Sequence, residues 1–189
     1  MSYIFKRELS EDERMVELDA QLQRGNHQSA SSKAVELVAK VYKDVTYGFA
    51  LPVAKSVVKL IKGAMVQPCG LAAQFSLTKT GLRVLKDRLT HDLSWCITQF
   101  DASVNNRCDL EAYPPMVYGW CLKRIIHYTV ALRLQYPEEK ILIAKYDFSD
   151  AYQRITHAAS TAAQTILVVG EIAYIMLRLS FGGSVNPPT

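Results

Sequence analysis

Apolar residues near the start of the chain recur at the spacing of an α-helix. The apolar positions within residues 11–24 are Met15, Val16, Leu18 and Leu22. Residues three and four positions apart share one face of a helix, so this period predicts an amphipathic helix. Ser10 and Glu13 precede the apolar run in a capping-box pattern, in which each side chain bonds the backbone amide of the other residue. Gly25 predicts the end of this helix.

Three later segments carry the same helical period. A second helix is predicted over residues 35–48, after a polar linker. Pro52 suits the first turn of a third helix, because a proline there gives up no helical hydrogen bond, and Gly63 ends it. A longer helix is predicted over residues 116–136, where Pro137 stops it.

Two pairs of segments alternate apolar and polar residues, as strands do. Residues 64–77 and 82–93 predict a first β-hairpin, with Lys79-Thr80-Gly81 as its turn. Residues 164–169 and 172–179 predict a second hairpin around Gly170-Glu171. The returning strand of the first hairpin is basic, and alternation places Lys86 and Arg88 on one of its faces.

One further segment, residues 140–147, contains the continuous apolar run Ile141-Leu142-Ile143-Ala144. A continuous apolar run predicts a strand that is buried along most of its length. Helices followed by strands interleaved with helices indicate an α+β fold.

Composition excludes several classes of protein. The 189 residues are 49% hydrophobic and 21% charged, which is typical of globular domains and not of disordered chains. The formal net charge of +4 permits a polyanionic partner without requiring one. There is no apolar signal core and no run long enough to span a membrane, so we expect an intracellular protein, cytoplasmic or nuclear, that is not secreted and does not bind a membrane. The four cysteines lack the close pairing of zinc ligands, which favours reduced thiols.

Three short segments carry the residues that favour chemistry. They are RLTHDLSW (88–95), KYDFSDAYQRI (145–155) and LRLSFGGSVNPP (177–188). Each segment alone has a plain structural explanation. Ser149 or Asp150 can cap a following helix, Tyr152 can be a core aromatic, and Arg88 can be a solvated strand residue. Their order along the chain is the more specific signal.

Taken in that order, the three segments resemble the fingers and palm of a reverse transcriptase from a retrotransposon-like element. DFSDAY is similar to the first catalytic motif of that family, and LSFGGSVNP is similar to its glycine-rich loop, with Ser180 where a proline is common. The resemblance implies a right-hand polymerase fold, α+β, that is truncated before the second catalytic carboxylate motif. It implies a helical N-terminal extension at 1–63, a fingers hairpin region at 64–110 and a partial palm at 111–189.

The resemblance also implies a metal site. Asp147 would be the catalytic carboxylate, and its side chain with the backbone carbonyl of Phe148 would hold Mg²⁺. Hard oxygen ligands suit this ion, which keeps several waters and accepts substrate phosphates as further ligands. Two such ions clamp the attacking and leaving oxygens of a phosphoryl transfer.

The remaining implied roles concern the nucleotide and the nucleic acid. Arg88 would grip the triphosphate, because a planar guanidinium binds phosphate oxygens in pairs. Tyr152 would exclude a ribose 2′-hydroxyl. The implied nucleotide-binding residues are Arg88, Asp150, Ala151, Tyr152, Phe181 and Gly182. The implied nucleic-acid-binding residues are Lys79, Arg83 and Lys86. The implied partners are an RNA or DNA template–primer and deoxynucleotides.

One part of the family pattern does not occur. No adjacent pair of aspartates is present in the 189 residues, and the chain stops soon after the glycine-rich loop. We therefore expect a polymerase fragment that is inactive without downstream sequence. Two alternatives remain: a non-catalytic nucleic-acid-binding or interaction domain descended from a retroelement, and a small α+β interaction domain outside the family. An aromatic residue followed by two aspartates in the downstream reading frame would favour the polymerase.

Overall fold

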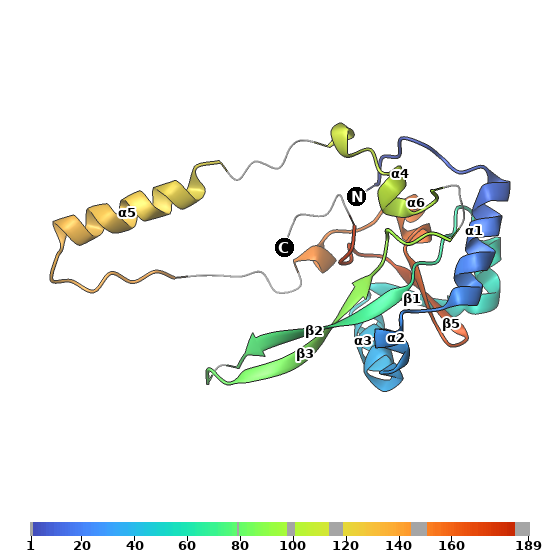
Figure 1. The fold of residues 1–189 in the computed structure, drawn as a ribbon, viewed down its shortest axis with the longest axis horizontal. Coiled ribbons are helices and arrows are strands. Elements are labelled where there is room, and N and C mark those ends of the chain that lie inside the picture. The colour runs from blue at the N-terminus through green and yellow to red at the C-terminus, as the bar shows by residue number, and fades with distance from the viewer. Residues whose placement is uncertain (1, 79, 98–100, 114–118, 145–150, 184–189) are drawn as a thin grey trace. The chain divides into compact units, whose positions relative to one another are not determined.

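The computed structural model describes residues 2–78, 80–97, 101–113, 119–144 and 151–183. The chain divides into two compact units, Met1–Tyr113 with Asp150–Thr189, and Pro114–Ser149. The fold is α+β with small antiparallel sheets, as the sequence predicts (Figure 1). The larger unit holds a three-stranded sheet and a separate two-stranded hairpin.

The first helix, α1 (Glu11–Arg24), begins and ends where its sequence predicts. The amide of Glu13 donates to the Ser10 hydroxyl at 3.3 Å, and the amide of Ser10 donates to the Glu13 carboxylate at 2.9 Å. Gly25 ends the helix with a φ of 74°, a value that glycine adopts without strain. Leu18 is fully buried, and Met15 and Leu22 pack against the same apolar cluster, whereas Val16 is 54% exposed.

The three-stranded sheet carries apolar side chains on both faces. Its strands are β1 (Ala50–Ala54), β4 (Ile166–Val169) and β5 (Ile172–Met176), in the order β1-β5-β4. Ile166 and Ala173 pack with Leu18 of α1 on one face. Leu167 packs with Leu37 on the other face, where α2 (Gln28–Ser31) and α3 (Ala34–Thr46) lie. The predicted second hairpin is confirmed as β4 and β5.

The third predicted helix is wrong. Residues 50–54 form strand β1, in which Pro52 lies opposite Tyr174 of β5. A proline removes one ladder hydrogen bond, which an edge strand such as β1 tolerates. The chain becomes helical only afterwards, as the 3-10 helix η1 (Lys55–Leu60). The proline therefore marks a sheet edge and not a helix start.

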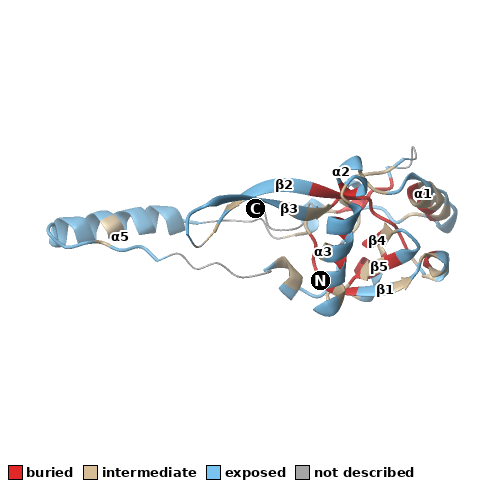
Figure 2. Ribbon diagram, turned by 90° about the horizontal axis from the view of Figure 1, so that it is seen from below, coloured by how far each residue is buried: buried red, intermediate tan, exposed pale blue. Residues whose placement is uncertain are grey.

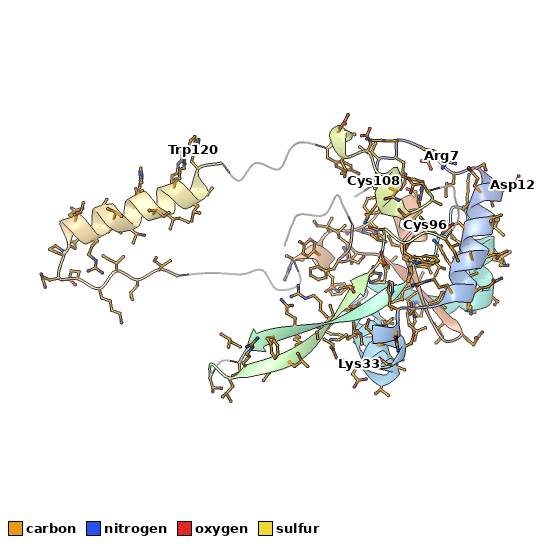
Figure 3. All side chains as sticks on the ribbon, viewed as in Figure 1. Arg7, Asp12, Lys33, Cys96, Cys108 and Trp120 are labelled. Atoms are coloured by element: carbon orange, nitrogen blue, oxygen red, sulfur yellow. The ribbon has the colours of Figure 1, made fainter. Side chains whose placement is uncertain are left out.

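The predicted first hairpin is confirmed as β2 (Cys69–Leu77) and β3 (Arg83–His91), paired from Cys69↔His91 to Leu77↔Arg83. Its base is buried and its tip is exposed (Figure 2). Lys33, labelled in Figure 3, ties the hairpin to the helical layer because its ammonium lies 2.8 Å from the Asp87 carboxylate.

The N-terminal segment is anchored by a small apolar cluster of its own. Tyr3 packs there with Leu93, Val104 and Cys108, and Cys108 is labelled in Figure 3. Val104 begins the short helix α4 (Val104–Arg107), and the 3-10 helix η2 (Leu110–Ala112) follows it. None of the four cysteines forms a disulfide bond. None of the helices in the described ranges combines the length and the apolar character that a membrane crossing requires.

The smaller unit contains helix α5 (Cys121–Gln135), which confirms the long predicted helix. None of its residues is buried within the described structure (Figure 2). The strand predicted over residues 140–147 does not form in its described part, since residues 140–144 have no regular structure and Leu142 is 78% exposed. A strand needs a neighbour to accept its hydrogen bonds, and no strand lies within this unit's described residues.

Candidate functional site

Three segments that are distant in the sequence meet at the ring of Phe181. The guanidinium carbon of Arg88, on β3, lies 4.8 Å from the centre of that ring. The ring of Tyr152 lies 4.6 Å from it, centre to centre, at an angle of 61°. Tyr152 begins the 3-10 helix η3 (Tyr152–Arg154). The structure thus brings together three of the residues that the sequence motifs singled out.

The loop that carries Phe181 is held from two sides. The amide of His91, at the end of β3, donates to the Phe181 carbonyl at 3.1 Å. The side-chain amide of Asn105, on α4, donates to the Gly182 carbonyl at 2.8 Å and to the Ser94 hydroxyl at 2.7 Å. These bonds fix the backbone of Phe181 beside β3, the strand that carries Arg88.

Gly182 allows the close approach of this loop to β3. Its φ is 122°, a conformation that residues with a side chain rarely adopt. A β-carbon at this position would lie 1.8 Å from the His91 carbonyl oxygen, far inside van der Waals contact. The resemblance implies a nucleotide-binding role for Gly182; in the structure, its close neighbour is the backbone of His91.

Tyr152 is positioned by a contact that the sequence did not indicate. The side-chain amide of Gln153 donates to the Asp44 carboxylate at 3.0 Å, which connects η3 to α3. Asp44 is only 8% exposed. Its place on the buried side of an amphipathic helix, next to Val41, is a signal that could have marked it, since buried carboxylates are rare unless they have a partner.

Two buried histidines are neighbours of each other, and one of them, His91, bonds to the loop of Phe181. Burial, and to a smaller extent the neighbouring His157, lower the pKa of His91 from 6.5 to about 4. Burial likewise lowers the pKa of His157 to about 4. Both imidazoles are therefore neutral at pH 7, which leaves Arg88 as the cation closest to the Phe181 ring among the described contacts.

The hairpin divides its basic residues between two faces. Lys86 and Arg88 lie opposite Gln74 and Ala72 and share a face, as alternation predicts. Arg83 belongs to the other face, where its guanidinium carbon lies 3.7 Å from the centre of the Phe75 ring. Lys79 lies outside the described residues.

The predicted metal ligands are not described. Asp147, Phe148 and Asp150 lie outside the described residues, while Ala151 is exposed at the start of η3. Among the described residues, no three His, Cys, Asp or Glu side chains gather to form a metal site. The Mg²⁺ site therefore stays a prediction from the sequence.

The chain was compared with protein families, curated proteins and solved structures. No family model, curated protein or solved structure matches it. The candidate site must therefore be interpreted from its own chemistry, which is one exposed guanidinium, two aromatic rings and a fixed loop.

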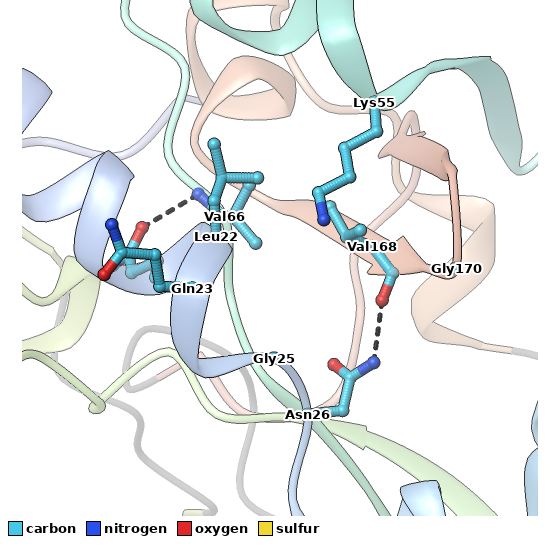
Figure 4. A pocket seen from close by; sticks show the side chains of 9 residues that line it. Leu22, Gln23, Gly25, Asn26, Lys55, Val66, Val168 and Gly170 are labelled. Atoms are coloured by element: carbon cyan, nitrogen blue, oxygen red, sulfur yellow. Dashed lines mark hydrogen bonds between the residues drawn. The ribbon is translucent and has the colours of Figure 1, made fainter.

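A shallow pocket of ≈ 260 Å³ lies elsewhere, between the end of α1 and the β4–β5 turn (Figure 4). Two of the amides lining it are engaged with backbone, since Asn26 donates to the Val168 carbonyl at 2.7 Å and Gln21 accepts from the Val66 amide at 3.0 Å. Lys55 points into it from the opposite side. None of the residues predicted from the motifs lines this pocket, so we interpret it as part of the scaffold.

Proposed function

We propose that this chain forms the fingers and part of the palm of an RNA-directed DNA polymerase, and that Arg88, Tyr152 and Phe181 bind the incoming deoxynucleoside triphosphate. The observation that carries the proposal is the meeting of these three side chains at one point. The three come from separate segments, and each segment was singled out as a polymerase motif from its sequence alone. Folding could have left the three apart.

The electrostatics of the site suit a phosphate chain. Arg88 is exposed, and Lys86 lies on the same strand face. A guanidinium offers parallel N–H donors that match phosphate oxygens, and the lysine adds a second positive charge. The predicted role of Arg88 is therefore to bind the β- and γ-phosphates of the nucleotide.

The aromatic part of the site suits the base and sugar. The rings of Tyr152 and Phe181 meet at 61°, so together they form two walls of a corner. A planar base can stack on an aromatic face, and such stacking tolerates any of the four bases. Tyr152 is the ring that we expect to contact the sugar and to exclude a 2′-hydroxyl.

The metal belongs to the same proposal. The carboxylate of Asp147 and the carbonyl of Phe148 are hard oxygen donors, which fit Mg²⁺. Bound there, Mg²⁺ would stabilise the negative charge that develops on the phosphoryl oxygens. Arg88 and the aromatic corner act before this step, because they bind and orient the nucleotide.

A second candidate function is non-catalytic binding of nucleic acid. The exposed face with Lys86 and Arg88 favours it, because phosphate contacts alone support binding without sequence preference. This function needs no nucleotide site, so the two candidates differ in their ligand.

Nucleotide binding by single-residue variants tests the proposal. We expect Arg88→Gln to weaken binding of deoxyadenosine triphosphate by about 10- to 100-fold, since a charge-assisted contact contributes about 1.5–3 kcal/mol. Arg83→Gln is the matched control, because it removes the same charge from the other face of the same hairpin. Titration calorimetry at fixed salt measures both.

Two results would count against the polymerase. Equal losses for Arg88→Gln and Arg83→Gln would indicate general attraction of an anion to the hairpin. Salt-dependent binding of single-stranded RNA or DNA, without binding of the free nucleotide, would favour the second candidate.

A further inference from the structure

Arg88 covers the aromatic surface that a base would use. Its guanidinium carbon lies 4.8 Å from the centre of the Phe181 ring, within the range of a cation–π contact. Tyr152 takes up a second side of the same ring. A base cannot stack on the face that Arg88 covers until the guanidinium has moved away.

Phe181 is the less mobile partner in this contact. Its carbonyl is bonded to the His91 amide, and Gly182 after it lies directly against the His91 carbonyl. Arg88, by contrast, is exposed, and none of the carboxylates in the described part of the chain forms a salt bridge with it. When the contact opens, we therefore expect the long arginine side chain to move more than the aromatic ring.

We propose that the Arg88–Phe181 contact makes the site selective for ligands that join a phosphate chain to a base. This inference rests on the proposed nucleotide site and makes the contact between Arg88 and Phe181 the determinant of its specificity. A phosphate chain alone draws Arg88 away from the ring and leaves the ring face uncovered. A nucleoside alone displaces Arg88 without offering it an anion.

A nucleoside triphosphate satisfies both groups together. Its base displaces the guanidinium of Arg88 from the Phe181 ring, and its phosphates bind that guanidinium. The base and the phosphates thus replace the contacts that Phe181 and Arg88 lose when they separate. An exposed cation–π contact corresponds to about two- to fivefold in an equilibrium constant, which sets the expected size of the effect. The phosphate chain alone and the nucleoside alone should each bind about two- to fivefold more weakly than they would if Arg88 did not contact Phe181.

Three ligands separate the contributions: inorganic tripolyphosphate, deoxyadenosine and deoxyadenosine triphosphate. We expect Phe181→Leu to bind tripolyphosphate about two- to fivefold more tightly, because Arg88 is released, and to bind deoxyadenosine triphosphate more weakly. Arg88→Gln should bind deoxyadenosine more tightly by a similar factor, because the ring face is open. Since Arg88 is an exposed strand residue, this second variant tests the inference even if Phe181→Leu does not fold.

The hairpin supplies a matched control. Arg83 stacks on Phe75 at 3.7 Å on the other strand face, so Phe75→Leu also releases an arginine from an aromatic ring. We expect this variant to leave tripolyphosphate binding unchanged, and an equal gain in Phe75→Leu and Phe181→Leu would overturn the inference.

The remaining outcomes separate the inference from the proposed function. If the wild-type chain binds deoxyadenosine triphosphate but neither Phe181→Leu nor Arg88→Gln shows its expected gain, the coupling is wrong and the nucleotide site stands. If none of the three ligands binds the wild type or either variant, the inference and the proposed function both fail. The inference is supported if Phe181→Leu binds tripolyphosphate more tightly, Arg88→Gln binds deoxyadenosine more tightly, and both variants bind deoxyadenosine triphosphate more weakly.

Discussion

Gly182→Ala should destabilise the larger unit by about 2–4 kcal/mol, because two costs coincide at this residue. The first is conformational, since φ is 122°. The second is steric, since the new β-carbon would lie 1.8 Å from the carbonyl oxygen of His91, a backbone atom that cannot rotate away. Chemical denaturation, followed by the fluorescence of the chain, measures the change in the free energy of unfolding.

Gly63→Ala separates the two costs. Gly63 has a φ of 74° and nothing within 4 Å of the added carbon, so only the conformational cost applies. We expect a loss of about 1 kcal/mol there. Similar losses for the two variants would mean that the loop at Gly182 moves freely, and the fixed position of Phe181 would then be wrong.

Acidification should destabilise the chain between pH 6.5 and about 4, because two histidines are buried without charge. Burial lowers the pKa of His91 and of His157 from 6.5 to about 4. In this pH range the two histidines are protonated in the unfolded chain and neutral in the folded chain. Their contribution to the free energy of unfolding is therefore complete above pH 6.5 and is lost as the pH falls. The loss is up to about 1.4 kcal/mol per pH unit for each histidine and stops below their folded pKa.

Carboxylates contribute at lower pH and can be separated from this effect. The hydrogen bond from Arg14 lowers the pKa of Glu11 below 4.5, so its contribution is lost only below that value. His157→Gln should reduce the slope of stability against pH between 6.5 and 4.5, measured by urea unfolding at a series of pH values. His127→Gln, on the exposed surface of α5, should leave the slope unchanged. If the stability of the wild type does not change between pH 6.5 and 4.5, His91 and His157 are not buried as neutral imidazoles.

Local patterns in the sequence predicted the three long helices and both hairpins, because the causes of these elements are local. The capping box of Ser10 and Glu13 fixes the start of α1 through bonds between residues three apart. Both hairpins follow from alternation and a turn. Pro52 led to a wrong prediction of a helix, because its structural role depends on a distant neighbour. Its position in an edge strand, opposite Tyr174 of β5, cannot be inferred from the local sequence.

The sequence predicted the side chains that meet at the candidate site, but it did not predict the hydrogen bonds that hold their backbone in place. Motif order singled out Arg88, Tyr152 and Phe181 without any knowledge of their distances. The bonds from His91 and Asn105 to the loop were not predictable, because they join residues that no periodicity connects. Such long-range contacts depend on how the elements pack, and packing is decided by the whole chain.

The central claim is that Arg88, Tyr152 and Phe181 form one nucleotide site, and photocrosslinking tests it most directly. The chain would be irradiated with a photoreactive deoxyadenosine triphosphate analogue whose reactive group is on the base, and the labelled peptides would be mapped by mass spectrometry. Our account predicts labels on Tyr152 or Phe181 that excess unmodified nucleotide removes and that Arg88→Gln reduces. Competable labelling at residues of the pocket beside Lys55, with none at Tyr152 or Phe181, would contradict it.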